Sequence, residues 1–225
     1  MVHHISPARL TIERVGEIID KKMKLALSEE SRARIERCRR YLDDKIESCT
    51  EPVYGITTGF GSLCNISIGK DDLSRLQENL VKSHSCGCGE LVDPEIVKIM
   101  LLTKVMSLSF GNSGVQLSTV QRLVDMFNED VIPVVYQQGS LGASGDLAPL
   151  ANMCLPLIGL GRVYYKGEVR PSGEVLEEKG WKPVHLVSKE GLALLNGTQF
   201  MSSHAVHAIL KARRLSALAD KIGAL

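Results

Sequence analysis

The chain has 225 residues, of which 27 are basic and 26 are acidic, so its formal net charge is +1. A charge this close to neutral gives no general attraction to nucleic acid or to an anionic membrane. The most apolar stretch, residues 147–161, holds two prolines and is too short to span a bilayer. The first residues lack the apolar segment of a secretory signal, so we expect a cytoplasmic protein whose six cysteines are free thiols.

The spacing of apolar residues predicts a mainly helical chain with small β and irregular segments. Ser28 precedes a charged run that predicts a capped amphipathic helix. The residues expected on one face of that helix are Ile35, Cys38, Leu42 and Ile46. Residues 54–61 contain three glycines and predict a loop. Asp93 and Pro94 are typical of the N-cap and first turn of a helix, which we expect to run to Leu108.

The second half of the chain also predicts both helical and β segments. Residues 113–127 predict a helix, and residues 131–140 predict a short strand or extended segment. Residues 162–173 are typical of a β-hairpin that turns at Lys166 and Gly167. No repeat, low-complexity tract or clear linker interrupts the chain.

Residues 139–151 read GSLGASGDLAPLA and contain the tripeptide Ala143, Ser144 and Gly145, which can become an electrophile. If the fold presses the Gly145 amide nitrogen onto the Ala143 carbonyl carbon, cyclisation with loss of two waters gives a five-membered imidazolone. The carbon from Ser144 then becomes an exposed methylidene. Glycine offers an unhindered nitrogen and wide dihedral freedom, alanine is small, and serine supplies the hydroxyl that leaves. The tripeptide thus predicts chemistry that proteins usually leave to cofactors.

Four segments, in the same order, resemble the motifs of the histidine and phenylalanine ammonia-lyase family. They are YGITTGFG at 54–61, LQENLVKSHSCGCGE at 76–90, GSLGASGDLAPLA at 139–151 and EGLALLNGTQ at 190–199. The resemblance covers nearly the whole chain. It implies the cofactor 4-methylidene-imidazol-5-one, formed from Ala143, Ser144 and Gly145, with no metal or nucleotide. It also implies the N-terminal region of the ammonia-lyase fold, which is mainly α with a small β and irregular part.

The resemblance assigns roles to Tyr54 and Asn196. Tyr54 matches a tyrosine that acts as a base near the substrate, and a phenol of pKa about 10 needs a fold that stabilises the phenolate or moves its proton in concert. On its loop position alone, Tyr54 reads equally as a buried ring with a satisfied hydroxyl. Asn196 matches an asparagine that holds the substrate and the cofactor region, and an amide can donate and accept at once. Its other readings are an Asn-Gly turn or an idle glycosylation sequon.

His84 bears on the choice of substrate. The pair Ser83 and His84 is similar to the histidine ammonia-lyase form, whereas phenylalanine ammonia-lyases usually have an apolar pair and tyrosine ammonia-lyases place the histidine first. An imidazole can exchange a hydrogen bond with an imidazole substrate, and a phenyl ring would leave it unpaired. The resemblance therefore implies elimination of ammonia from L-histidine to give trans-urocanate. Phenylalanine or tyrosine ammonia-lyase and a 2,3-aminomutase that uses the same cofactor are the alternatives.

Other readings of these residues are open. Asp146 either helps the cyclisation or caps the following helix. Metal binding by His84, Cys86 and Cys88 is disfavoured because Cys-Gly-Cys lacks the spacing of common zinc motifs. Ser144 is a poor hydrolase nucleophile, since Asp146 stands where a nucleophile elbow needs glycine. Relatives commonly have a basic residue after SGV, where this chain has Gln116.

The length predicts an incomplete lyase. Family members continue for a stretch comparable to this whole chain, and apolar residues still recur at helical spacing from Val206 to Leu225. We therefore expect residues 1–200 to form the cofactor-bearing catalytic domain and residues 201–225 to begin a long bundle helix, cut or naturally shortened. Relatives are homotetramers with shared active sites, which predicts a homo-oligomer. A shortened noncatalytic subunit or folding fragment is the alternative.

Overall fold

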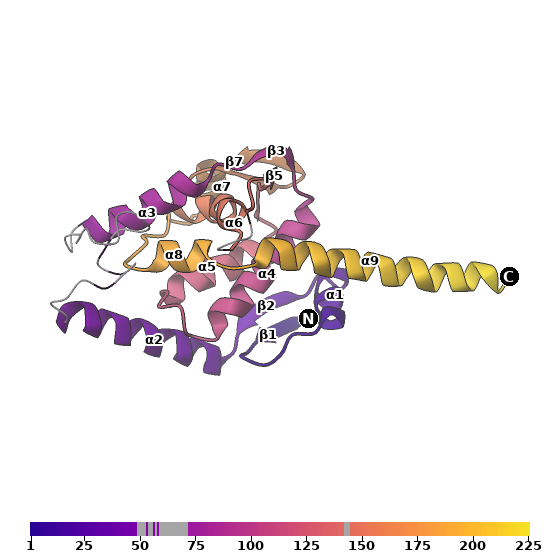
Figure 1. Cartoon of the computed structure of the whole chain (residues 1–225), viewed down its shortest axis with the longest axis horizontal. Coiled ribbons are helices and arrows are strands. Elements are labelled where there is room, and N and C mark those ends of the chain that lie inside the picture. Colours follow the sequence, from indigo (N-terminus) through magenta and orange to yellow (C-terminus); the bar gives the residue numbers. More distant parts are fainter. Residues whose placement is uncertain (49–52, 54–55, 57, 59–71, 142–144) are drawn as a thin grey trace.

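The structure is a computed structural model that describes residues 1–48, 53, 56, 58, 72–141 and 145–225. In this part the chain is mainly helical, as the sequence predicts (Figure 1). Its helices are α1 (Ile12–Asp20), α2 (Glu29–Ser48), α3 (Leu73–His84), α4 (Pro94–Ser109), α5 (Leu117–Asn128), α6 (Leu147–Cys154), α7 (Ser172–Glu178), α8 (Glu190–Leu195) and α9 (Gln199–Gly223), with a 3-10 turn, η3, at Leu155–Ile158.

The strands form small separate sheets at the edges of the helical core. β1 (Val2–Ile5) pairs in parallel with β2 (Lys24–Leu27). β3 (Cys88–Leu91) pairs antiparallel with β5 (Tyr136–Gln138). The third sheet, antiparallel in the order β4-β6-β7, consists of β4 (Ile132–Pro133), β6 (Arg162–Tyr165) and β7 (Glu168–Pro171).

The predicted hairpin and extended segment are both confirmed. β6 and β7 form the hairpin, and its two turn residues have positive φ, +52° at Lys166 and +86° at Gly167. This is the backbone that a tight hairpin turn requires. Residues 131–140 contain the two short strands β4 and β5. β5 leads directly into the loop that carries the tripeptide.

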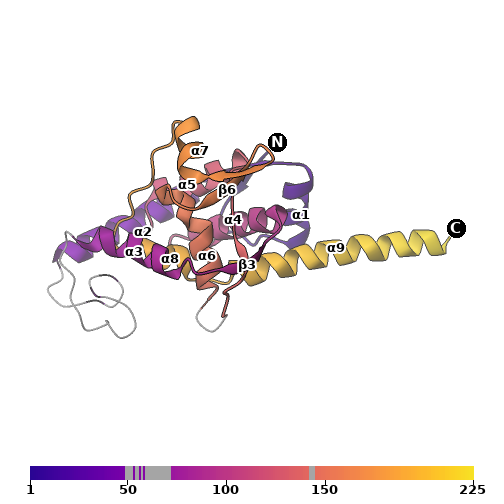
Figure 2. The ribbon, with the colours of Figure 1, turned by 90° about the horizontal axis from the view of Figure 1, so that it is seen from above.

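Helix α4 forms the centre of the molecule, with α9, α5 and α2 packed around it (Figures 1 and 2). Its side chains are apolar on almost every side, which is typical of a helix that is buried all round. Its Asp93 cap is confirmed, because the Asp93 carboxylate accepts a hydrogen bond from the Glu95 amide. The helix ends at Ser109, one residue beyond the predicted end.

The amphipathic helix after Ser28 is also confirmed as α2. The Ser28 hydroxyl accepts a hydrogen bond from the Ser31 amide at 3.1 Å, which satisfies a donor of the first turn. Ile35 and Leu42 are buried as expected, whereas the other two residues predicted on this face are only half-buried. A charged residue, Arg39, is buried on the same face.

The predicted helix over residues 113–127 is wrong at its start, since α5 begins at Leu117. Gly114 has a φ of +70°, which an α-helix does not allow. The amide of Gln116 is instead bound to the carboxylate of Glu190, at 2.8 Å. A long-range contact thus replaces the first helical turn.

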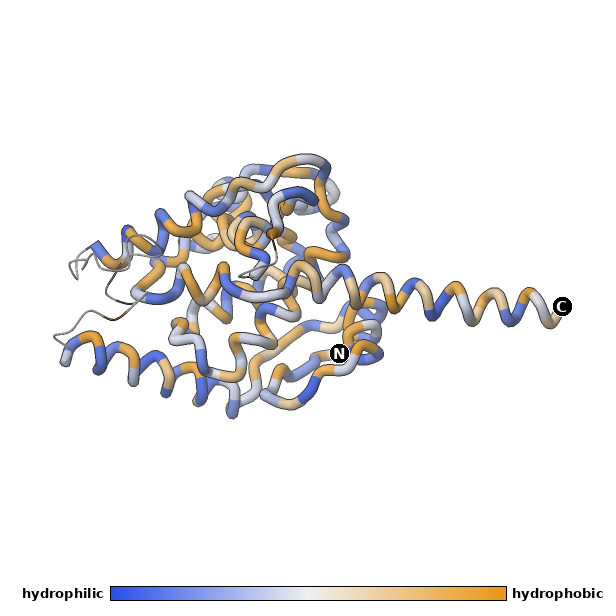
Figure 3. Tube along the Cα trace, viewed as in Figure 1, coloured by the Kyte–Doolittle hydropathy of each residue, from blue (hydrophilic) through white to orange (hydrophobic). Residues whose placement is uncertain are grey.

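Helix α9 begins against α4, passes α1 and then extends beyond the other elements (Figures 1 and 2). Residues 211–225 are exposed throughout, and hydrophobic and hydrophilic positions alternate along them (Figure 3). Near α1, Arg213 and Arg214 form ion pairs with Glu13 and Asp20. Among the described residues, no helix is both long and apolar enough to cross a membrane.

Candidate active site

The candidate site lies where β5 passes into α6. The tripeptide loop connects these elements, and the structure describes its last residue, Gly145, together with Asp146. Tyr54, Ala143 and Ser144 lie outside the described residues. The site is therefore built from the groups around Gly145.

Gly145 is packed tightly against the loop between α8 and α9. Its φ is +107°, and a Cβ added here would lie 2.8 Å from the Gly197 carbonyl oxygen and 2.9 Å from Asn196 Oδ1. The next amide, of Asp146, donates to the same Gly197 carbonyl at 2.7 Å. Both the dihedral angle and the space require glycine at position 145. The tripeptide loop and the asparagine motif, about 50 residues apart in sequence, thus form one contact.

The carboxylate of Asp146 is fully buried and joins three parts of this site. It accepts a hydrogen bond from Ser140 Oγ at 2.8 Å and from the Met201 amide at 3.0 Å. Asp146 occupies the N-cap position of α6, but its side chain makes no capping hydrogen bond there. The capping alternative is therefore wrong for the following helix, because the carboxylate instead satisfies an amide in the first turn of α9.

His84 is the last residue of α3 and is half-buried. Its Nδ1 lies 2.9 Å from the Leu80 carbonyl oxygen and 3.1 Å from Ser83 Oγ. A carbonyl only accepts, so this contact places the proton of a neutral His84 on Nδ1. Nε2 makes no hydrogen bond to another described residue. The ring is thus oriented by its own helix, with an acceptor nitrogen left for a ligand.

His84 and Gly145 line one hollow with a volume of ≈ 150 Å³. Its other described walls are Cys86, Gly139, Leu141, Leu147 and Ala148. The hollow is mostly apolar, with the imidazole as its main polar group. A small substrate in it would contact the imidazole and the end of the tripeptide together.

Asn196 is the C-cap residue of α8 and is exposed, and its Oδ1 lies beside Gly145. Its backbone is held from the interior. Lys104 Nζ donates to the Asn196 carbonyl oxygen at 3.2 Å. Lys104 lies in the apolar run of α4 and is 1% exposed. Burial lowers the pKa of Lys104 to about 8. Sequence reasoning missed Lys104, although a lone lysine in IMLLTKVMSL was a visible signal.

Helix α3, which ends at His84, is tied to α8, which Asn196 follows directly. The buried side chain of Gln77 accepts a hydrogen bond from the Gly191 amide at 3.0 Å. A side chain at position 191 would collide with Gln77, since a Cβ would lie 2.9 Å from the Gln77 carbonyl oxygen. The two segments that carry predicted site residues are therefore fixed to each other through α3 and α8.

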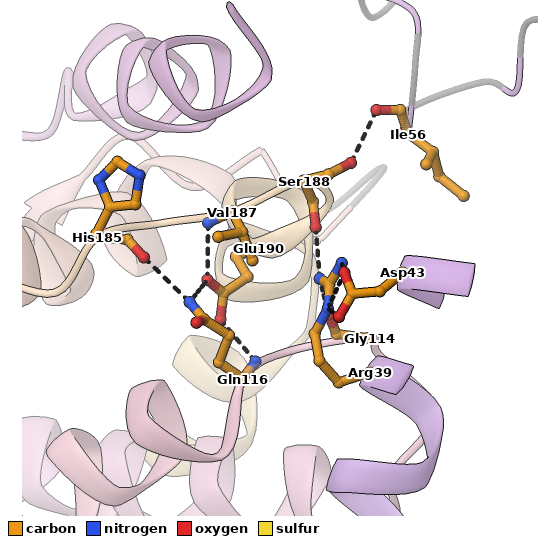
Figure 4. Close-up of polar contacts among 9 residues, drawn as sticks. All are labelled: Arg39, Asp43, Ile56, Gly114, Gln116, His185, Val187, Ser188 and Glu190. Atoms are coloured by element: carbon orange, nitrogen blue, oxygen red, sulfur yellow. Dashed lines mark hydrogen bonds and ion pairs between the residues drawn. The ribbon is translucent and has the colours of Figure 1, made fainter. Parts of the chain in front are cut away.

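The start of α8 is anchored by a buried carboxylate (Figure 4). Glu190 is 0% exposed and accepts four hydrogen bonds from uncharged donors. Two come from Gln116, whose amide nitrogen and Nε2 lie at 2.8 and 2.7 Å. The others come from Thr119 Oγ1 at 2.6 Å and the Val187 amide at 2.9 Å. The departure at Gln116 thus supplies a neutral partner to Glu190.

Arg39 and Ser188 extend this anchor toward Ile56 (Figure 4). Arg39 Nη1 donates to the carbonyls of Gly114 and Ser188, at 2.7 and 2.9 Å, and its guanidinium is paired with Asp43. The hydroxyl of Ser188 donates to the carbonyl of Ile56 at 2.9 Å. Ile56 is two residues from Tyr54, so the backbone near the predicted base is attached to the segment that leads to Asn196.

The described part of the chain contains no group of three or more His, Cys, Asp or Glu side chains placed to hold a metal ion. Cys38, Cys86, Cys88 and Cys154 are free thiols. Burial raises the pKa of the Cys154 thiol to about 12, so this thiol is uncharged at neutral pH.

The chain belongs to the aromatic amino acid lyase family, whose model matches residues 10–225. It is 44% identical over 216 residues to the histidine ammonia-lyase of Clostridium tetani, across 96% of this chain and 42% of that protein. The crystal structure of histidine ammonia-lyase from Trypanosoma cruzi matches with a TM-score of 0.89 and 37% identity, across 98% of this chain and 42% of that one. Phenylalanine aminomutase from Pantoea agglomerans matches with a TM-score of 0.88 and 29% identity, across 96% and 41%.

These similarities confirm the predicted family and the ammonia-lyase fold. The chain spans about two fifths of the length of these relatives.

Proposed function

We propose that this chain carries the cofactor-forming part of a histidine ammonia-lyase, which eliminates ammonia from L-histidine to give trans-urocanate. The observation that carries the proposal is the contact of Gly145 with Asn196 beside the hollow lined by His84. Three parts of the proposed site meet there: Gly145 of the proposed electrophile, the loop of Asn196 that would orient it, and His84, which would recognise an imidazole.

The surroundings of Gly145 fit the cyclised tripeptide. Its left-handed backbone and its lack of a side chain suit a residue whose nitrogen must approach a carbonyl two positions earlier. Asp146 holds the C-terminal end of the loop, because its carboxylate accepts hydrogen bonds from the Ser140 hydroxyl and the Met201 amide. We infer that Ala143, Ser144 and Gly145 form 4-methylidene-imidazol-5-one, which when formed supplies an electron sink for the elimination.

The side chains have distinct roles in this proposal. His84 accepts a hydrogen bond from the substrate imidazole through Nε2, which is consistent with the use of Nδ1 by Leu80. Asn196 holds the substrate carboxylate or the cofactor oxygen with its amide. Tyr54 takes the β-hydrogen as the general base. We further infer that the catalytic region ends near residue 200, that residues 201–225 start a bundle helix, and that the protein acts as a homo-oligomer.

The intact mass of the purified chain under denaturing conditions tests the proposal first. A mass two waters below that calculated from the sequence is expected, and Ser144→Ala, which lacks the leaving hydroxyl, is the matched control without this loss. An unmodified wild-type mass would contradict ring formation in this chain and favour a noncatalytic subunit or fragment.

Product analysis with histidine, phenylalanine and tyrosine then tests the substrate. Trans-urocanate from histidine is the expected product. The structural likeness to a phenylalanine aminomutase keeps a 2,3-aminomutase as the second candidate, and a β-amino acid product would establish it in place of the lyase.

A further inference from the structure

Lys104 is a buried cation for which the proposed chemistry has no use. It is 1% exposed on α4, in the middle of the apolar core. Among the described residues, its Nζ donates one hydrogen bond, to the Asn196 carbonyl oxygen at 3.2 Å. A cation in such a place is costly unless its contacts compensate. A leucine or methionine would fill the same space without that cost.

The carbonyl that Lys104 holds belongs to the peptide between Asn196 and Gly197. This peptide lies in the break between α8 and α9, where helical hydrogen bonds do not fix its orientation. Asn196 there has an extended backbone, with a ψ of 122°. A donor inside the core therefore fixes how this peptide plane is turned, and with it the ψ angle of Asn196 and the position of Gly197.

The opposite side of the same loop contacts the tripeptide. The Gly197 carbonyl accepts from the Asp146 amide at 2.7 Å, and Asn196 Oδ1 faces Gly145. The contacts thus run from the Lys104 ammonium through two successive peptide units: the Asn196–Gly197 peptide lies beside Gly145, and the next carbonyl, of Gly197, binds the Asp146 amide. A hydrogen bond to the carbonyl also polarises its peptide, which strengthens the Gly197 N–H as a donor.

We propose that Lys104 is a positioning residue that clamps the Asn196–Gly197 peptide against Gly145, so that the tripeptide is held for cyclisation and the Asn196 amide is presented to the substrate. The clamp rests on the contacts of Lys104, Asn196 and Gly145 alone, whereas its effect on cyclisation and turnover rests on the proposed function. Burial lowers the pKa of Lys104 to about 8, so the ammonium form predominates at neutral pH.

Amide hydrogen exchange tests the clamp without requiring activity. The Asp146 amide reports the contact directly, because it donates to Gly197. In Lys104→Met we expect this amide to exchange at least tenfold faster than in the wild type. The matched control is Lys98→Met, on the same helix, where the lysine is paired with Asp130 away from the site. Wild-type exchange of the Asp146 amide in a folded Lys104→Met variant would overturn the proposal.

Cyclisation and kinetics separate positioning from simple packing. We expect the fraction of Lys104→Met chains that lose two waters to fall severalfold, and Lys104→Arg, which keeps a cation, to restore it. In cyclised material, kcat should fall more than KM rises. If the wild-type chain itself does not lose two waters, the proposed function fails here, and the exchange of the Asp146 amide still decides the role of Lys104.

A second measurement applies if Lys104→Met does not fold. The protection of the Asp146 amide, corrected for base-catalysed exchange, is compared at pH 7 and pH 9 in the wild type and in Lys104→Arg. Protection should fall in the wild type, as the lysine loses its proton, and stay constant in the arginine variant. Equal protection at both pH values in the wild type would overturn the proposal.

Discussion

Replacing Lys104 with methionine should make the protein more stable at neutral pH. The pKa of Lys104 is lowered from 10.5 to about 8, mainly by burial. Each pKa unit corresponds to about 1.4 kcal/mol, so the buried charge costs roughly 3 kcal/mol at pH 7. Methionine has similar length and carries no charge, but it loses the hydrogen bond to Asn196, which is worth about 1 kcal/mol. The expected net gain is about 2 kcal/mol, or roughly 4–8 °C in Tm for a chain of this size.

The pH dependence of this gain follows from the same shift. Between about pH 8 and pH 10.5 the unfolded lysine keeps its proton while the folded one has lost it, so the unfolded state binds more protons. The free energy of unfolding of the wild type therefore rises with pH across this window. Lys104→Met lacks that rise, and its advantage should disappear by about pH 10.5.

Urea unfolding followed by the fluorescence of Trp181, the single tryptophan, measures both quantities. Lys98→Met is the control, expected to change the free energy of unfolding by less than about 1 kcal/mol, because its lysine is an ion-paired side chain near the surface. A Lys104→Met variant less stable than the wild type at pH 7, or a difference independent of pH up to 10.5, would refute the reasoning.

Three further variants address the site. Gly145→Ala should prevent the loss of two waters and lower the free energy of unfolding by about 1–3 kcal/mol, because position 145 has a positive φ and the added Cβ would meet Asn196. Intact mass and urea unfolding measure the two effects, and a cyclised variant would contradict the prediction. His84→Leu should lower kcat/KM for histidine at least tenfold and shift the ratio toward phenylalanine; an unchanged ratio in parallel assays would remove His84 from substrate recognition. Glu190→Gln places an NH₂ group against hydrogen-bond donors and should lower the free energy of unfolding in urea by roughly 2 kcal/mol. Glu177→Gln, at an exposed position, is the control and should unfold like the wild type; equal effects of the two variants would argue against the anchoring role of Glu190.

The local features of the fold were readable from short sequence patterns. Asp93 before Pro94 predicted a helix start, and the pair at positions 166 and 167 predicted a hairpin turn, and both are confirmed. Each depends on a hydrogen bond or dihedral angle within a few residues, which sequence encodes directly. The helix expected from residue 113 fails for the complementary reason: its first turn is replaced by the bond from Gln116 to Glu190, 74 positions further on.

For the candidate site, too, the sequence indicated the residues but not their contacts. Motifs in the sequence named Gly145, Asp146, His84 and Asn196, but not how they are held. That Asp146 reaches into α9, and that Lys104 supports Asn196 from the core, depends on helices packing together across long sequence separations.

The sequence by itself determined the family, through the resemblance of four motifs, and the helical character and the residue types that the proposed chemistry needs, through local patterns. Only the tertiary structure decided that the tripeptide loop contacts the loop that holds Asn196, that His84 and Gly145 line one hollow, and that a buried lysine binds the Asn196 carbonyl. The physical reason is that burial, desolvation and hydrogen-bond partners are set by which distant segments meet, and a linear pattern does not specify those meetings.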